Sequence, residues 1–145
     1  VDKWSFNIGT LRMALGQVKE KNWKKLDKWV DAFKGKHQPL YGIASGGNIN
    51  TIQKSFIKHK EPEVYYDDLK YTISKLEKLS IDERILKYGF KPDRADVIVP
   101  AATIFMHIME HLNIDKLYVP KVGLGDGMIH EMYEKVISKK QSKKK

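Results

Sequence analysis

The sequence contains no cysteine among its 145 residues. This absence excludes disulfide bonds and thiol chemistry, and it fits the reducing cytosol, so we expect a cytoplasmic protein. Long apolar runs are also missing, because none approaches the roughly 20 residues needed to cross a bilayer. We therefore expect no membrane partner.

The N-terminus shows no signal peptide, and the sequence begins at Val1 rather than at a methionine. We therefore expect an excised domain or a part of a longer protein. The length is that of one domain with a core of its own. A composition of 41% hydrophobic and 31% charged residues is that of an ordinary soluble globular protein.

Acidic residues are in deficit, with 18 Asp and Glu against 27 Lys and Arg and a net charge of +9. This balance favours an acidic partner, and polyphosphate, nucleotides, nucleic acid and anionic membranes all qualify by charge. Five of the last seven residues are lysine. Such a run is typical of a solvated tail, so we expect a folded domain over residues 1–138 and a disordered tail over 139–145.

The hydrophobic pattern predicts three strands, over residues 4–13, 39–45 and 117–122. The same pattern, with the cap signals, predicts about six helices, beginning near residues 23, 48, 67, 81, 92 and 127. Strands that alternate with helices indicate an α/β fold with helices packed on a sheet. The stretch 59–63 reads as a loop.

Several residues mark the expected helix boundaries. Asn22 is predicted to cap the first helix and Gly35 to end it. Ser80 and Glu83 have the form of a capping box for a helix that stops at Gly89. Pro92 suits a first helical turn, and Pro100 is expected to kink the long helix that follows.

The apolar stripes predict a mostly buried set of side chains: Trp29, Phe33, Leu76, Ile98, Ile104 and Ile108. Four lysines lie on the opposite face of the first helix: Lys24, Lys25, Lys28 and Lys34. A solvated face is the simplest interpretation of these lysines, and the steering of phosphate is the alternative.

A glycine turn lies between a predicted strand and a predicted helix, in the stretch Gly42-Ile-Ala-Ser-Gly-Gly-Asn48. Glycine lets the backbone approach a ligand closely, and the first N–H groups of a helix attract anions. Ser45, Gly46, Gly47 and Asn48 are therefore the candidate phosphate-binding residues. A plain turn is the alternative interpretation.

Four segments, in order, resemble the exopolyphosphatase / guanosine pentaphosphate phosphatase (Ppx/GppA) family. They are residues 5–12, the glycine turn over 42–52, residues 91–102 with Arg94-Ala-Asp96, and residues 114–129 with Gly123-Leu-Gly-Asp-Gly127. The resemblance spans most of the chain. The sequence departs from the family pattern at Asn48, where Thr is usual, at Ala101, where Gly is common, and at Gly125 and Asp126, where Arg and Glu are usual. We expect these departures to bear on activity and not on fold.

The resemblance implies the C-terminal lobe of a two-lobed, actin/Hsp70-like catalytic core, with a ribonuclease-H-like lobe reduced to a three-stranded partial sheet. It implies hydrolysis of terminal phosphoanhydride bonds in polyphosphate or guanosine pentaphosphate, assisted by Mg²⁺. The catalytic glutamate and both phosphate loops of the family would lie upstream of Val1, in a facing N-terminal lobe. This chain alone is then expected to be inactive.

Arg94 is a secondary candidate for a phosphate contact, with helix capping and surface pairing as the favoured alternative. The partners expected are polyphosphate or guanosine pentaphosphate, the N-terminal lobe and a second copy of the chain, but not nucleic acid. A non-catalytic module that binds polyanions or nucleotides, or a structural scaffold lobe, is the alternative function.

Two further patterns have an unremarkable interpretation. His107-Ile-Met-Glu-His111 matches the H-x-x-E-H pattern of zinc peptidases, with Glu131 or Glu134 as a third ligand in principle. The pattern is short, so we expect no metal site. The string Gly123-x-Gly125-x-Gly127 is interpreted as a tight turn that packs the last helix against the sheet.

Overall fold

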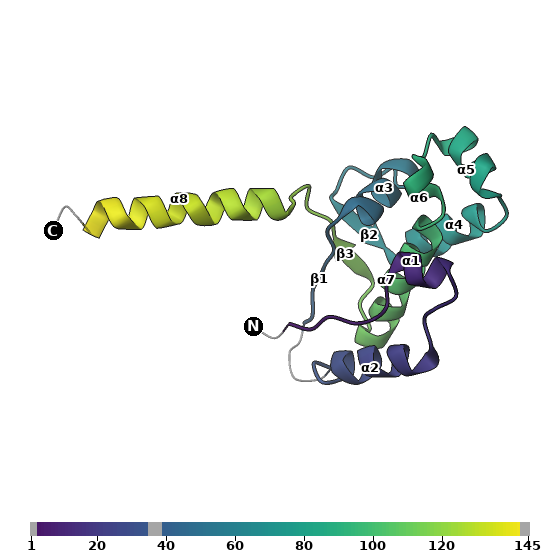
Figure 1. The fold of residues 1–145 in the computed structure, drawn as a ribbon, viewed down its shortest axis with the longest axis horizontal. Helices are drawn as coiled ribbons and strands as arrows, with labels where there is room; N and C mark the ends of the chain where they lie inside the picture. The colour runs from purple at the N-terminus through teal and green to yellow at the C-terminus, as the bar shows by residue number, and fades with distance from the viewer. Residues whose placement is uncertain (1–2, 35–38, 143–145) are drawn as a thin grey trace.

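The computed structural model describes residues 3–34 and 39–142. Within them lie eight helical segments and three short strands (Figure 1). In chain order they are α1 (Thr10–Ala14), α2 (Glu20–Asp31), β1 (Gly42–Ile43), α3 (Gly47–Phe56), β2 (Glu63–Tyr65), α4 (Tyr66–Leu76), α5 (Ile81–Tyr88), α6 (Pro92–Ala95), α7 (Ile98–Leu112), β3 (Lys116–Tyr118) and α8 (Leu124–Ser142).

The three strands form one sheet in the order β1-β3-β2. β1 runs parallel to β3, with Gly42 opposite Leu117, and β2 runs antiparallel to it, with Val64 opposite Leu117. The predicted α/β class with a three-stranded sheet is confirmed. Two of the predicted strands are present in shortened form, as β1 and β3.

The strand predicted over residues 4–13 is wrong. Its second half is the short helix α1, and no strand is assigned to its first half. Leu11, Arg12, Met13 and Ala14 are good helix formers, which explains the helix. Leu11 is exposed, so the apolar alternation that suggested a strand does not mark a core face.

The third strand of the sheet is β2, at the end of the stretch expected to be a loop. Its sequence signal is weak, because only Val64 of its three residues is buried. Glu63 instead makes polar bonds along the sheet: its carboxylate accepts from Lys116 Nζ at 2.8 Å and from the hydroxyl of Tyr65 at 2.7 Å. In a strand of three residues with one core side chain, the alternation of apolar and polar residues is too short to be detected in the sequence.

The helix expected from residue 92 to residue 112 is two helices. Pro92 is the first residue of α6, as predicted, but α6 ends at Ala95 and α7 begins at Ile98. Pro100 therefore lies in the first turn of α7 and does not kink it. Proline has no N–H to donate to the carbonyl of Asp96, so the ladder is interrupted and the helix starts again.

The capping box of α5 is confirmed. The amide of Glu83 donates to the Ser80 hydroxyl at 3.2 Å, the Ser80 amide donates to the Glu83 carboxylate at 2.7 Å, and Gly89 ends the helix with φ of 65°. Asn22 is not the N-cap of α2, which begins earlier. Its side chain instead accepts from the Lys19 amide at 3.0 Å, in the third position of the helix. Gly35 lies outside the described residues.

α7 is the central helix, and it contacts α1, α2, α3 and α4. The largest fully buried side chains include Ile52, Leu69, Ile98 and Met109, which belong to the cluster around it. Of the predicted core, Leu76 and Ile98 are fully buried, and the other four are partly buried: Trp29, Phe33, Ile104 and Ile108. In α2 the buried side chains are instead Leu26 and Val30.

Contrary to the expectation that no apolar run approaches the length of a bilayer, residues Pro92–Leu112 have the length and composition of a membrane-crossing helix, the one such stretch in the described residues. In the structure they are α6 and α7, and 33% of the apolar window is buried inside the protein. α7 contacts α1, α2, α3 and α4 and carries the buried side chains of Ile98, Ala101, Ala102 and Met109. The core helix of a globular domain meets the same criteria of length and composition.

The last helix extends away from the rest of the molecule (Figure 1). It begins at Leu124, not near residue 127, so Gly125 and Gly127 lie inside it rather than in a turn against the sheet. The Asp126 carboxylate accepts from the Gly123 amide at 2.7 Å and so fixes the start of the helix.

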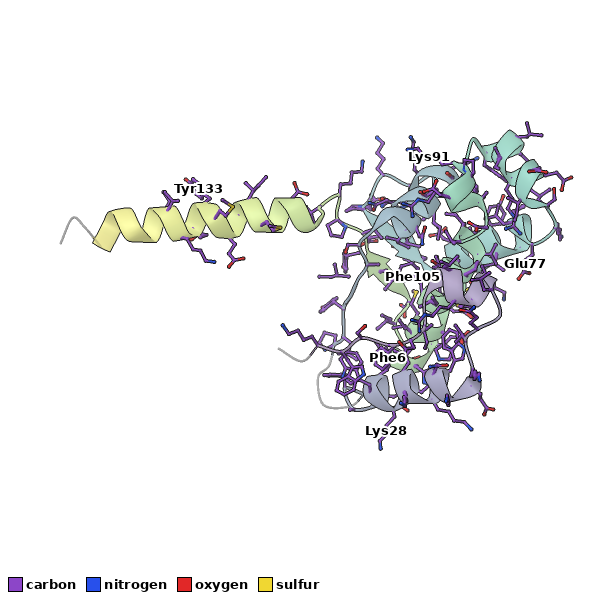
Figure 2. The ribbon with its side chains drawn as sticks, in the orientation of Figure 1. Phe6, Lys28, Glu77, Lys91, Phe105 and Tyr133 are labelled. Carbon is purple, nitrogen blue, oxygen red and sulfur yellow. The ribbon has the colours of Figure 1, made fainter. Side chains whose placement is uncertain are left out.

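Figure 2 shows Tyr133 on this projecting segment. α8 includes residues 139–142 of the expected tail, and 143–145 lie outside the described residues.

We expect the substitution Leu69→Ala to lower the free energy of unfolding by about 2–5 kcal/mol, since it leaves a cavity under α7. Leu86 on α5 is 85% exposed and provides the matched control, since Leu86→Ala should change it by less than about 0.5 kcal/mol. Urea denaturation of both variants measures the difference. Equal losses would show that the packing between α4 and α7 is wrongly described.

The bonds from Lys116 and Tyr65 lower the pKa of Glu63 below its usual 4.5. A carboxyl group whose pKa is lower in the folded than in the unfolded state stabilises the fold at pH values above its unfolded-state pKa. This stabilisation is lost as the pH falls through the folded-state pKa. Glu63→Gln should therefore be less stable than the parent near pH 7, and the two should converge as pH falls towards about 3. Urea denaturation at both pH values tests this, with the exposed Glu77→Gln as control. A difference that persists unchanged in acid would contradict it.

Candidate functional site

A small open pocket, which we call the glycine-turn pocket, lies where β1 leads into α3. Its lining comes from four parts of the chain: Thr10 of α1; Ser45, Gly46, Gly47, Asn48 and Ile49 of the turn and α3; Arg94 of α6; and Ala101, Ile104 and Phe105 of α7. Figure 2 shows Phe105 in the middle of the main body of the molecule. The structure thus brings together all five candidate phosphate-binding residues.

Gly46 makes the turn possible. Its φ of 117° and ψ of 170° lie in a region that is essentially restricted to glycine. α3 begins at the next residue, and the Gly46 carbonyl accepts the Asn50 amide at 3.2 Å. The first N–H groups of a helix have no acceptor within it, and those of α3 begin at the turn that lines the pocket. This arrangement favours an anion.

Arg94 is held against the start of α3. Its Nη1 donates to the side-chain oxygen of Asn48 at 3.1 Å, and its Nε lies 3.6 Å from a carboxylate oxygen of Asp93. A Cβ atom placed on Gly47 would come within 3.1–3.2 Å of the guanidinium carbon and nitrogens. Glycine at this position therefore lets the guanidinium approach the helix start closely, and one positive charge lies beside the backbone donors.

The rest of the lining was not identified from the sequence. Thr10 belongs to a segment that carries the family resemblance, but the strand expected there gave it no role. Ile104 and Phe105 lie on α7; Ile104 was expected to be core, and Phe105 was given no role. They are only partly buried, because they also form the apolar wall of this pocket.

The lining of the glycine-turn pocket does not fit a Mg²⁺ ion. Mg²⁺ takes oxygen ligands and is usually held by one or two carboxylates, and none of the ten lining residues is acidic. Asp96, next to Arg94 in sequence, has a carboxylate oxygen that is buried without a hydrogen-bond partner among the described residues. It does not line the pocket, so the structure gives no reason to place a metal ion there.

The two histidines of the H-x-x-E-H pattern lie elsewhere on α7, beside α2. His107 Nε2 lies 2.6 Å and His111 Nε2 lies 3.4 Å from the same carboxylate oxygen of Asp27. The acidic residue that meets the pair is therefore on α2, and not Glu131 or Glu134, which lie on α8. We call Asp27, His107 and His111 the histidine cluster.

Comparison with known proteins finds a matching family. The family model of the Ppx/GppA phosphatases matches residues 10–136. No curated protein matches the chain.

Solved structures share the fold. The type II variant of the Aquifex aeolicus Ppx/GppA phosphatase aligns with a TM-score of 0.70 at 20% identity, over 89% of this chain and 48% of that one. An exopolyphosphatase from Cytophaga hutchinsonii aligns with a TM-score of 0.70 at 19% identity, over 92% of this chain and 50% of that one. An exopolyphosphatase-like protein aligns with a TM-score of 0.65 at 20% identity, over 92% of this chain and 51% of that one.

The chain therefore spans about half the length of these solved relatives, as one lobe of a two-lobed protein would. The expected fold, a ribonuclease-H-like lobe of the actin-like ATPase type, is confirmed. Because the family model covers most of the described residues, and the lobe has the same fold as these solved members, the chain belongs to the Ppx/GppA phosphatase family.

Proposed function

We propose that this chain is one lobe of a phosphohydrolase that cleaves terminal phosphoanhydride bonds in polyphosphate or guanosine pentaphosphate. It supplies one wall of the phosphate-binding cleft, formed by Ser45, Gly46, Gly47, Asn48 and Arg94. The observation that carries this proposal is the guanidinium of Arg94 held against a glycine-built helix start, within a family of phosphatases.

The chemistry of this wall is binding and charge stabilisation. Backbone N–H groups at the start of α3 would donate to non-bridging phosphate oxygens. The planar guanidinium group of Arg94 would donate to oxygens of the same phosphate. Asn48 accepts one of the guanidinium donors, which fixes the side chain and leaves others for a ligand. Preorganised donors of this kind stabilise the charge that develops during phosphoryl transfer.

No residue of the glycine-turn pocket is a suitable general base. Its lining has no carboxylate and no histidine. Water is a poor nucleophile and needs a positioned base, which contributes about 10²–10⁴-fold to the rate. We therefore propose that the base, together with any ligands of Mg²⁺, comes from the half of the two-lobed relatives that this chain does not span.

A non-catalytic module that binds polyphosphate or a nucleotide is the second candidate function. The same observation favours it: a pocket with donors and a positive charge but without a base can bind an anion and leave it intact. Binding and turnover therefore need separate tests.

Arg94→Ala should weaken the binding of tripolyphosphate by about tenfold or more, because it removes a charge-assisted hydrogen bond. Arg94→Lys keeps the positive charge but loses the planar guanidinium group, so its affinity for tripolyphosphate should lie between those of Arg94→Ala and the parent. Lys70 lies on α4, is exposed and does not line the glycine-turn pocket, so Lys70→Ala removes one positive charge away from the site and serves as the control. Titration followed by NMR should shift the amides of Gly46, Gly47 and Asn48 in the parent. Shifts confined to residues 139–145 would exclude the site.

We expect the 145-residue chain alone to release no phosphate from polyphosphate or guanosine pentaphosphate above background, even with Mg²⁺. In an open half-cleft each hydrogen bond acts in water and contributes little. Addition of the facing lobe, in cis or in trans, should restore turnover if the chain is catalytic. Turnover by the chain alone would show that the catalytic residues are misplaced. Binding without turnover after addition of the lobe would favour the non-catalytic module.

A further inference from the structure

We propose that Asp27, His107 and His111 form a binding site for a divalent transition-metal ion, with Zn²⁺ as the ion that the donor set fits. The site joins α2 to α7 and is separate from the glycine-turn pocket. The three donor atoms lie within 4.8 Å of one another, and this is the one group of three or more such residues with that geometry among the described residues.

The helical spacing of the donors creates the site. His107 and His111 are four residues apart on α7, so their side chains lie one above the other on the same face. Their ring centroids are 4.6 Å apart. Asp27 and Asp31 are also four residues apart, on α2, and α2 packs against α7. The histidine pair of α7 and Asp27 of α2 place two nitrogen donors and one oxygen donor around one point, and Asp31 lies beside His111.

The distances are close to those of a loaded site. Zinc lies about 2.0–2.2 Å from nitrogen and oxygen ligands, so donors in a tetrahedral site are about 3.3–3.6 Å apart. His111 Nε2 is already 3.4 Å from Asp27 Oδ1. His107 Nε2 is at 2.6 Å, which is a hydrogen-bond distance, and it would move out by less than about 1 Å when a metal ion replaces the shared proton.

A second carboxylate lies near one ligand. Asp31 Oδ1 lies 3.7 Å from Nδ1 of His111, the nitrogen that points away from Asp27. Metal-binding histidines commonly donate their other N–H to a carboxylate, which fixes the ring and strengthens it as a ligand. At 3.7 Å Asp31 is beyond hydrogen-bond distance, so it would have to move closer to position His111 in this way. Both histidines have Nε2 near the same oxygen of Asp27.

The donor set selects the class of metal. Two imidazoles and one carboxylate suit Zn²⁺ and its neighbours, whereas Mg²⁺ and Ca²⁺ prefer oxygen ligands. The three side chains are 24–32% exposed, so an ion has access from solvent and water can complete the coordination. From the H-x-x-E-H pattern alone we expected no metal site, because that pattern supplies only two ligands. The structure supplies the third, Asp27, from 80 positions away, and this contact is the reason for the present proposal.

The test uses the full 145-residue chain, freed of metal with a chelator and titrated with Zn²⁺ by calorimetry. We expect one ion per chain with a sub-micromolar dissociation constant. His107→Ala and Asp27→Asn should each weaken binding at least about tenfold, and Asp31→Asn should weaken it less, because Asp31 is not a ligand and lies 3.7 Å from His111 Nδ1. His130→Ala on α8 and Asp82→Asn on α5 are matched controls and should bind as the parent does.

A second measurement localises the ion and does not depend on the ligand variants folding. The Trp23 ring lies 4.4 Å from the His107 ring, centroid to centroid. A paramagnetic ion such as Cu²⁺ at the histidine cluster should quench the fluorescence of Trp23, and most of the quenching should disappear in Trp23→Phe. The proposal is overturned if the parent shows no stoichiometric site, if the controls lose binding as the ligand variants do, or if quenching persists in Trp23→Phe.

Discussion

The burial of α7 is the constraint on which the rest of the structure depends. This helix is apolar over most of its length, and it must be covered by neighbours to keep that surface from water. α1, α2, α3 and α4 all contact it, and these contacts bring distant parts of the chain together. One stretch of α7, with Ile104 and Phe105, forms a wall of the glycine-turn pocket. The next two turns carry the histidines that meet α2. Both sites therefore lie on one rigid element, roughly 7 Å apart along its axis.

Local chemistry accounts for the parts of this fold that the sequence predicts well. The capping box at Ser80, the αL glycine at position 89 and the proline at the start of α6 are each decided by the residues themselves. The glycine turn was also predictable as a turn, because φ of 117° at position 46 is open to glycine and closed to most other residues. Recognition of the family added the fold, since four weak motifs in a fixed order are informative where each alone is not.

Tertiary contacts account for the parts that sequence reasoning missed. The segment 4–13 alternates like a strand, but no neighbouring strand pairs with it and its helix formers prevail. β2 is a strand because it pairs with β3, and a sequence of three residues is too short to predict that pairing. The role of Arg94 beside Asn48 depends on a contact across 46 positions, and that of Asp27 beside His107 on one across 80. Short patterns such as H-x-x-E-H cannot specify their missing ligand, because the partner is chosen by packing and not by spacing.

The two sites differ in what they can do without a partner, and the difference follows from electrostatics. The histidine cluster is complete within one lobe: its donors come from two packed helices, and water can fill the remaining coordination positions. The glycine-turn pocket is one wall, with donors and a single cation but no base and no metal ligand. Hydrogen bonds to a phosphate there act in high dielectric until a second wall excludes water, and only then do they gain strength. On the proposed function, such a lobe would bind weakly when alone and would contribute to catalysis when the cleft closes over it. We therefore expect the charge on Arg94 to matter most in the assembled protein, where the same geometry is desolvated.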